Sequence, residues 1–421
     1  MLDRKFILAN VDQVKENVRK RNMRVDIDLF VQKDAERVAL ERRLQDINQR
    51  ANEIARNTPA SGPEKDAAIE TARALRAERT EAKDKLAALE LEVDALQGAI
   101  PNMADARAPE GASDEANLVL GYGAAAKREF AFAPKDHVDL CEALDLLDMK
   151  AGSKVAGHGF YFLKNEAVLL DLALQRFAID VLRKRGFTAL ATPDLARIEM
   201  LAGTGYAPRG SETQIYMVEG TDLGLIATAE ITLGGMYAGV TFDASELPLR
   251  LCGLSHCFRT EAGAHGRATR GLYRVHQFTK VEMFVFCTPD QSEAMHLEVL
   301  ENERYIFDQL GVPYRYVENA TGDLGAAAYR KFDLEAWMPG RGEWGEVTSA
   351  SNCTDYQARR LRTRCKSGSE ATLAHTLNGT AIATGRAMIA IVENYQRADG
   401  GIDMPKALQP YLGFDAILPR T

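Results

Sequence analysis

The chain has 421 residues, 46% hydrophobic and 27% charged, which is the composition of an ordinary globular protein with room for two or three domains. Its formal net charge of −8 argues against a protein that coats nucleic acid, although a local basic patch stays possible. The sequence has no run of 18 apolar residues and its start lacks a signal-peptide core, so we expect a cytoplasmic protein, or the mature form of an organellar one, that makes no membrane contact.

Residues 29–98 carry two apolar ladders whose steps alternate four and three residues, as in the seam of a coiled coil. The first ladder runs from Leu40 to Ile54, and the second runs from Ala68 to Ile100 with Arg79 as its one polar member. Residues 57–63 between them have the composition of a turn. We therefore predict an N-terminal domain, residues 1–100, built on a long antiparallel helical hairpin, each arm ~45 Å long at 1.5 Å per residue.

The outer part of this hairpin is more basic than the rest of the chain. Residues 42–85 hold ten Lys and Arg against eight Asp and Glu, a local charge of +2 in a chain of −8. The simpler interpretation of this pattern is a solvated coiled coil of mixed charge, and the alternative is a surface that follows a phosphate backbone. Charge alone does not decide between them.

Residues 101–125 are rich in Pro, Gly and Asp and are predicted to be a linker. From residue 126 to 421, aromatic residues and alternating apolar segments return, with helical periodicity at 170–187 and 292–311. The fold class expected for this part is α+β, with a mainly antiparallel sheet flanked by helices.

The six cysteines include no CxxC pair, and the seven histidines lack the spacing of metal ligands. We interpret the cysteines as reduced, mostly buried thiols and expect no zinc site.

The segment from Phe258 to Phe284 is expected to form two strands joined by a loop rich in Arg and Gly. Guanidinium groups bind phosphate oxygens in pairs, and glycine lets the backbone approach a ligand closely. A surface loop with incidental arginines is the alternative. The residues concerned are Arg259, Arg267, Arg270 and Arg274, with Gly263, Gly266 and Gly271.

This segment resembles motif 2 of the class II aminoacyl-tRNA synthetases. "RGFTALATPDL", with Pro193, resembles motif 1, and "TLNGTAIATGRAMIAIVEN", with Arg386, resembles motif 3. Together with the hairpin, the "TAE" at 228–230 and "FDLEAWMPGRGEWGEVTSASNCTDYQARR", the ordered set is similar to the seryl-tRNA synthetases along essentially the whole chain.

The resemblance implies ATP-dependent attachment of L-serine to tRNA(Ser) through a seryl-adenylate. It also implies a homodimer, Mg²⁺ as the metal, serylation of tRNA(Sec), and recognition of the long variable arm of tRNA(Ser) by the hairpin.

The resemblance also assigns roles to particular residues. Catalysis falls to Arg259, Glu282 and Arg386, and Mg²⁺ binding falls to Glu346 and Ser349. Serine is expected to contact Thr228, Ala229, Glu230, Arg259, Glu282 and Thr380, with Glu282 and Thr380 recognising its hydroxyl. ATP is expected to contact Arg259, Thr260, Glu261, Arg274, Phe278, Glu346, Val347, Thr348, Ser349 and Arg386. The tRNA is expected to contact Arg42, Arg43, Arg50, Arg73, Arg76 and Arg79 of the hairpin.

Two other functions are compatible with parts of this pattern. A relative that activates an amino acid and loads a carrier protein would lack the hairpin, which this chain has. A catalytically inactive RNA-binding module would be expected to lose Arg259, Glu282, Glu346 or Arg386, and all four are present.

Overall fold

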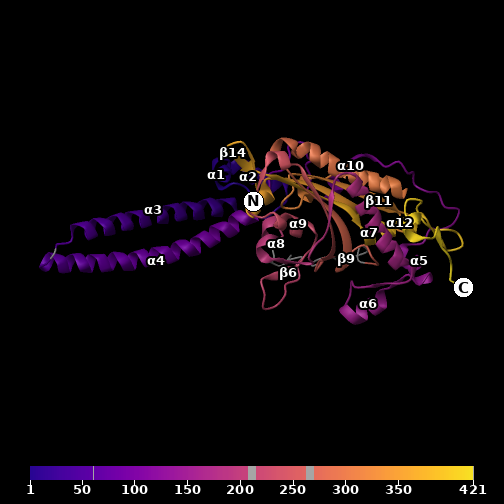
Figure 1. Cartoon of the computed structure of the whole chain (residues 1–421), viewed down its shortest axis with the longest axis horizontal. Helices are drawn as coiled ribbons and strands as arrows, with labels where there is room; N and C mark the ends of the chain where they lie inside the picture. The colour runs from indigo at the N-terminus through magenta and orange to yellow at the C-terminus, as the bar shows by residue number, and fades with distance from the viewer. Residues whose placement is uncertain (60, 207–214, 262–269, 421) are drawn as a thin grey trace. The chain divides into compact units, whose positions relative to one another are not determined.

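The computed structural model describes residues 1–59, 61–206, 215–261 and 270–420, which form two compact units, Met1–Pro101 and Asn102–Thr421 (Figure 1). Arg267, Gly263 and Gly266 of the predicted phosphate loop lie outside the described residues. No helix of the described part of the chain is long and apolar enough to cross a membrane.

All the regular secondary structure described in the first unit is helical. Two short helices, α1 (Arg4–Ala9) and α2 (Val11–Lys20), precede the long antiparallel pair α3 (Ile27–Asn57) and α4 (Pro63–Ala99) (Figure 1). Asp26 caps α3 by accepting a hydrogen bond from the Leu29 N–H, and Pro63 starts α4, where its missing N–H costs nothing. The predicted hairpin is therefore confirmed, with its turn at the expected place.

The seam of this hairpin uses the predicted apolar ladders. Leu44 and Ile47 of α3 pack with Leu75 and Ala82 of α4, and the partly buried Leu40, Ala51, Ile54 and Leu86 flank them. Arg79, at a ladder position, is exposed, because the contact between the helices leaves its long polar side chain in water.

The second unit is built on an eight-stranded sheet with the strand order β1-β10-β11-β12-β15-β9-β8-β4. Every neighbouring pair is antiparallel except β4 with β8, which confirms the predicted α+β class. The strands in this order are Leu118–Tyr122, Tyr314–Glu318, Arg330–Met338, Glu343–Thr354, His375–Ala383, Gln277–Cys287, Leu249–Phe258 and Thr188–Ala191.

The segment predicted as a linker belongs to this unit instead. β1 (Leu118–Tyr122) pairs with β10 at the edge of the sheet, and the backbone N–H groups of Asn102 and Asp105 donate to the carbonyls of Ala326 and Tyr329. The Pro, Gly and Asp residues around "LVLGY" led to the prediction of a linker. The segment forms a strand because its backbone pairs with β10, whatever the composition of its neighbours.

Three helices pack on the sheet to form the main core: α7 (Glu166–Lys184), α10 (Ser292–Leu310) and α12 (Thr384–Asn394). The pleat of β9 divides its side chains between two environments. Val281, Met283 and Val285 belong to that core, whereas Phe278, Lys280 and Glu282 line a cavity.

The remaining elements connect or cover these layers. The helices are α5 (His137–Ala143), α6 (Met149–Ala156), α8 (Ile198–Thr204), α9 (Glu230–Met236), α11 (Tyr356–Leu361) and α13 (Gln409–Leu412). The small strands are β2 (Leu147–Asp148), β3 (Phe162–Leu163), β5 (Leu195–Arg197), β6 (Leu223–Leu225), β7 (Thr241–Asp243), β13 (Arg364–Ser367), β14 (Glu370–Leu373), β16 (Ile402–Asp403) and β17 (Ala416–Ile417).

Candidate active site

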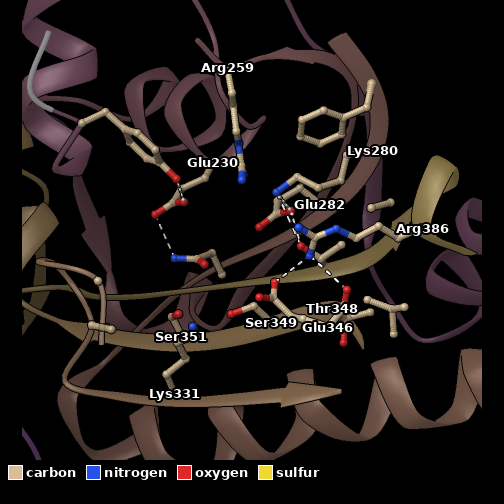
Figure 2. Close-up of a pocket in the computed structure, with 18 of the residues that line it drawn as sticks. Glu230, Arg259, Lys280, Glu282, Lys331, Glu346, Thr348, Ser349, Ser351 and Arg386 are labelled. Carbon is tan, nitrogen blue, oxygen red and sulfur yellow. Dashed lines mark hydrogen bonds and ion pairs between the residues drawn. The ribbon is translucent and has the colours of Figure 1, made fainter. Parts of the chain in front are cut away.

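A cavity of about 450 Å³ lies over the central strands β9, β12 and β15 (Figure 2). Figure 2 shows the Arg259 side chain entering it between Glu230 and Glu282, with Glu346, Ser349 and Arg386 along another wall. The lining includes most of the predicted site residues: Glu230, Arg259, Glu261, Arg274, Phe278, Glu282, Glu346, Val347, Thr348, Ser349, Thr380 and Arg386.

One end of the cavity holds a compact polar cluster centred on Glu282, which is 2% exposed. Lys280 Nζ lies 2.5 Å from Glu282 Oε2, and the Thr380 hydroxyl donates to the same oxygen at 3.2 Å. Register explains the contact, because Thr380 on β15 lies directly opposite Glu282 on β9. The cluster therefore offers a small ligand both an acceptor and donors in a buried setting.

Glu230, at the start of α9, is a second buried carboxyl group beside this cluster. Gln357 Nε2 and Asn378 Nδ2 donate to its Oε1 at 2.6 and 2.9 Å, and the Tyr206 hydroxyl donates to its Oε2 at 3.2 Å. Burial raises the pKa of Glu230 to about 7, and the negative charge of Glu282 adds to this shift. A cation that binds in the cavity beside Glu230 would therefore favour its ionised form.

Arg259 follows β8 and is held by backbone contacts on both sides. Its N–H donates to the His276 carbonyl at 3.0 Å, and its Nε donates to the Ala227 carbonyl at 3.4 Å. The guanidinium lies 5.2 Å from the ring centre of Phe278. Its charge therefore faces the cavity, and its two Nη groups have no hydrogen-bond partner among the residues that the structure describes, so they can meet an anion.

Glu261 and Arg274 form an ion pair across the two ends of the Arg-rich loop, with Arg274 Nη1 2.7 Å from Glu261 Oε2. Glu261 adopts a left-handed backbone conformation, φ +48°, which is uncommon outside glycine. The ion pair holds the two ends of the loop together, and the predicted contact of Arg274 with ATP stays a prediction.

Arg386, in the first turn of α12, closes the other end of the cavity. Its Nη1 donates to the side-chain and backbone oxygens of Glu346, at 2.9 and 3.0 Å, and its guanidinium stacks 4.7 Å from the Tyr273 ring centre. Burial pushes the pKa of Glu346 upward, but the charge of Arg386, with Lys331 and Arg259, outweighs it and holds that pKa below its usual value.

The donor set at Glu346 and Ser349 suits a hard cation. Glu346 is an ionised carboxylate with 43% of its side chain exposed, and Ser349 lines the same cavity. Mg²⁺ prefers one or two carboxylates with phosphate oxygens and water, so these residues fit it. Thr348 Oγ1 donates instead to Glu303 of α10 at 2.8 Å.

Three predicted contacts lie beside the cavity without lining it: Thr228, Ala229 and Thr260. Thr228 is fully buried, and its hydroxyl accepts a hydrogen bond from the Glu230 N–H at 3.3 Å. Ala229 is fully buried in the apolar cluster under α9. In this structure Thr228 orients Glu230, and its contact with serine stays a prediction.

Sequence reasoning missed several lining residues, above all Lys280. It stands two residues from both Phe278 and Glu282 on one strand, so the strand period already placed it on the same face. Tyr206, Lys331 and Asn378 also line the cavity, and Gln357 lies behind Glu230, but no local pattern marked them.

The six arginines predicted to contact tRNA are all exposed on the hairpin. Arg43 Nη2 lies 2.9 Å from Glu78 on the facing helix, and Arg50 lies 3.9 Å from Asp46. Among the residues that the structure describes, the other four, Arg42, Arg73, Arg76 and Arg79, have no ion-pair partner.

Comparison with known proteins agrees with this arrangement. Residues 1–104 match the seryl-tRNA synthetase N-terminal domain family, and residues 216–395 match the tRNA synthetase class II core domain (G, H, P, S and T) family. A serine–tRNA ligase of Rhodopirellula baltica is 56% identical over 424 residues, covering 99% of each chain. Another from Rubrobacter xylanophilus is 53% identical and covers 100% of this chain and 99% of its own.

Solved structures show the same relationship. A seryl-tRNA synthetase from Pyrococcus horikoshii, in complex with ATP, superposes with a TM-score of 0.91 at 37% identity over 100% of both chains. The cytoplasmic enzyme of Naegleria fowleri, in complex with AMP, gives 0.83 at 32% identity, over 99% of this chain and 98% of that one. The chain therefore belongs to the seryl-tRNA synthetases, the class II serine–tRNA ligases that attach serine to tRNA.

Proposed function

We propose that the cavity over β9, β12 and β15 forms seryl-adenylate from L-serine and ATP and then transfers the seryl group to tRNA(Ser). A serine carboxylate oxygen attacks the α-phosphorus, and the bond to pyrophosphate breaks. The 3′-terminal ribose hydroxyl of the tRNA then attacks the carbonyl carbon, loses its proton and releases AMP. Little covalent chemistry falls to the protein, so positioning and charge stabilisation carry the catalysis.

The observation that carries this proposal is the meeting of Arg259, Glu282 and Arg386 in one cavity. Arg259 enters the cavity between Glu230 and Glu282, where it can contact both the α-phosphate and the serine carboxylate. Arg386 would bind the γ-phosphate and lie against adenine, and Phe278 would stack on the other face of adenine. The solved relative in complex with ATP supports a nucleotide site here.

Serine is the substrate that the Glu282 cluster fits. The serine hydroxyl can donate to Glu282 and contact the Thr380 hydroxyl, while Glu230 and Glu282 receive the ammonium group. Alanine would leave Glu282, Lys280 and Thr380 with one partner fewer in a buried site, which costs binding energy.

Mg²⁺ would be held by Glu346 and Ser349 and would neutralise charge on the phosphates of ATP. The ionised state of Glu346 and its exposure to the cavity support this assignment.

The proposal extends to the remaining substrates and to assembly. Exposed arginines of the hairpin would contact the tRNA backbone, and tRNA(Sec) would be a second acceptor. The enzyme would be a homodimer. The helix α7 exposes an apolar strip made of Val168, Leu169 and Leu172, which a second copy of the chain would cover.

Serine-dependent exchange of pyrophosphate into ATP, without tRNA, tests the two-step reaction. We expect exchange with serine alone, and charging of tRNA(Ser) and tRNA(Sec) once these are added. Exchange that requires tRNA would contradict a free adenylate intermediate, and exchange with alanine in place of serine would contradict the substrate assignment.

A further inference from the structure

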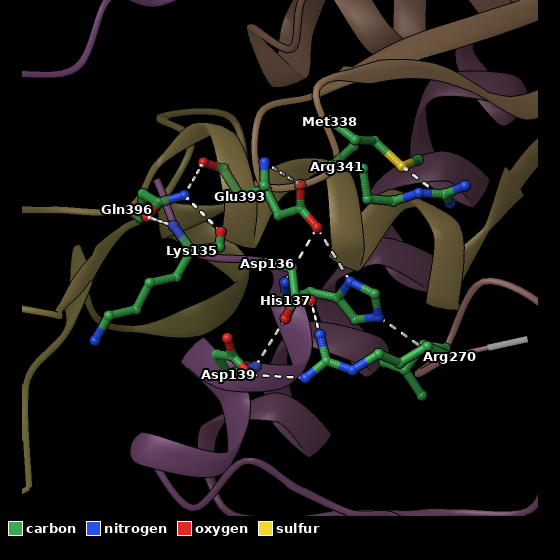
Figure 3. Close-up of polar contacts among 12 residues, drawn as sticks. Lys135, Asp136, His137, Asp139, Arg270, Met338, Arg341, Glu393 and Gln396 are labelled. Atoms are coloured by element: carbon green, nitrogen blue, oxygen red, sulfur yellow. Dashed lines mark hydrogen bonds and ion pairs between the residues drawn. The ribbon is translucent and has the colours of Figure 1, made fainter. Parts of the chain in front are cut away.

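A buried histidine that the proposed chemistry does not use lies behind the Arg386 end of the cavity. His137, the first residue of α5, is 3% exposed (Figure 3). Its Nδ1 lies 3.1 Å from Glu393 Oε1, and its Nε2 lies 3.2 Å from the backbone nitrogen of Leu272. It thus joins the C-terminal part of α12 to the segment that leaves the Arg-rich loop.

These contacts fix the tautomer of the imidazole. The Leu272 N–H can only donate, so Nε2 is the acceptor and Nδ1 carries the proton that it donates to Glu393. The other oxygen of Glu393 accepts from the Gly340 N–H at 2.9 Å, and Glu393 is fully buried. The Glu393 carboxylate and the His137 imidazole therefore connect α12, α5, the turn between β11 and β12, and the segment 270–273 that follows the Arg-rich loop, here called the loop exit.

The segment held by His137 supports Arg386. Leu272 is followed by Tyr273, whose carbonyl accepts from Arg386 Nε at 3.4 Å and whose ring lies under its guanidinium. Arg341, in the turn that Glu393 also holds, stacks on the same ring at 4.5 Å. A shift of Leu272 would therefore move the platform on which Arg386 rests.

The fit around His137 is tight. Gly271 has φ +74°, and a side-chain carbon there would lie 2.1 Å from His137 Nε2. Beside it, Arg270 pairs with Asp136 and Asp139 of the α5 N-terminus, the latter at 2.7 Å (Figure 3). The loop exit is thus docked on α5 by an ion-pair clamp and by one buried hydrogen bond.

We propose that His137, oriented by Glu393, is a positioning residue for ATP. It holds Leu272 and Tyr273 so that Arg386 and Arg274 meet the phosphates and adenine in the right place. This inference rests on the proposed function, since it takes both arginines as contacts of ATP. His137 itself touches no substrate.

Two substitutions separate the contacts of His137. In His137→Asn the amide can still donate to Glu393, but nothing reaches the Leu272 N–H. In His137→Gln an oxygen returns near the Nε2 position. We expect the KM for ATP in pyrophosphate exchange to rise about tenfold in His137→Asn, with the KM for serine within about twofold of wild type, and the Gln variant to recover most of the loss.

Gly271→Ala tests the same contact from the other side, because the added carbon displaces the imidazole. The same ATP-selective rise in KM is expected. His375→Asn is the control, since this partly buried histidine starts β15 at the end away from Thr380 and contacts neither Leu272 nor Glu393. It should lower the melting temperature at most, without changing either KM.

Arg386→Ala separates this inference from the proposed function. A raised KM for ATP in Arg386→Ala together with wild-type values in His137→Asn and Gly271→Ala would overturn the role of His137 alone. An unchanged KM for ATP in Arg386→Ala would overturn the ATP site and the inference with it. If the KM for serine and the KM for ATP rise equally in His137→Asn and do not recover in His137→Gln, His137 only stabilises the core and does not position ATP.

Discussion

Glu230 is the residue whose ionisation should control serine binding near neutral pH. Its pKa of about 7 means that much of it is protonated just below pH 7, and a neutral carboxyl group attracts an ammonium group weakly. We expect kcat/KM for serine to fall below pH 7, approaching tenfold per pH unit, because this ratio reports the free enzyme. Glu230→Gln should flatten the profile at a lower value, and a wild-type profile flat to pH 5.5 would contradict this role.

The same group should influence stability with a definite sign. Between about pH 4.5 and 7 the folded protein keeps a proton on Glu230 that the unfolded chain has released, so the free energy of unfolding falls as pH rises through this window. The effect is on the order of 3 kcal/mol for a fully buried carboxyl group shifted this far. Chemical denaturation of wild type and Glu230→Gln at several pH values measures it, and parallel curves for the two proteins would contradict it.

Lys280 should be essential for the serine end of the cavity. Replacing it with Met leaves Glu282 buried without its cation, and breaking one partner of a buried ion pair costs roughly 3–5 kcal/mol. We expect Lys280→Met to lose stability by about this amount and to raise the KM for serine more than the KM for ATP. Denaturation and exchange kinetics on one preparation test this, and a stable variant with wild-type serine KM would contradict it.

At the residue scale, local patterns predicted some of the site and could not predict the rest. Phe278 and Glu282 lie on one face of β9, as their spacing requires, and Lys280 could have been found by the same rule. Gln357 and Asn378, which hold Glu230, come from α11 and β15, far away in the sequence. Only the pairing of the sheet brings them to Glu230, and no local period encodes it.

At the scale of elements, the helical hairpin carries a claim about tRNA. Arg42, Arg73 and Arg76 are exposed and have no ion-pair partner among the described residues, so their charges are available to a phosphate backbone. Replacing all three with Ala should raise the KM for tRNA(Ser) in charging by about tenfold or more and lower its salt dependence, since each phosphate contact releases counterions.

The matched control neutralises three exposed acids of the same hairpin, Glu53, Glu70 and Asp84, with Gln or Asn. Serine-dependent exchange without tRNA should stay at the wild-type rate in both triple variants. If the arginine variant charges tRNA(Ser) like wild type over a range of salt concentrations, these three arginines do not bind the phosphate backbone of the tRNA.

The elements themselves were predicted where periodicity is long and strong. α3, α4 and α10 follow sustained apolar patterns, and α10 ends as expected on Gly311 in a left-handed conformation. β1 was missed, because five residues within a turn-like segment give too short a pattern, and its pairing with β10 depends on residues almost 200 positions away.

At the scale of the whole molecule, the proposed dimer makes the exposed apolar strip of α7 an interface. Leu169 and Leu172 are 47% and 54% exposed. Replacing both with Glu would bury charge without a partner at such an interface. We expect sedimentation to show a dimer for wild type and a monomer for Leu169→Glu/Leu172→Glu.

Leu297→Glu on α10 is the control, because this leucine is 50% exposed and belongs to a different helix. It should leave the dimer intact. A wild-type protein that sediments as a monomer at micromolar concentration would contradict the proposed assembly, and a dimeric double variant would place the interface elsewhere.

Calorimetric binding of a non-hydrolysable seryl-adenylate analogue, seryl sulfamoyl adenosine, directly tests whether this cavity binds seryl-adenylate. It should be compared with the alanyl analogue in wild type, Arg259→Ala and Glu282→Gln. We expect the seryl analogue to bind wild type at least about 100-fold more tightly, because a buried site built for a hydroxyl rejects a ligand that lacks it. Glu282→Gln should erase most of this preference, and Arg259→Ala should weaken both analogues. Equal binding of the two analogues to wild type, or unchanged binding in both variants, would contradict the assignment of this cavity to seryl-adenylate.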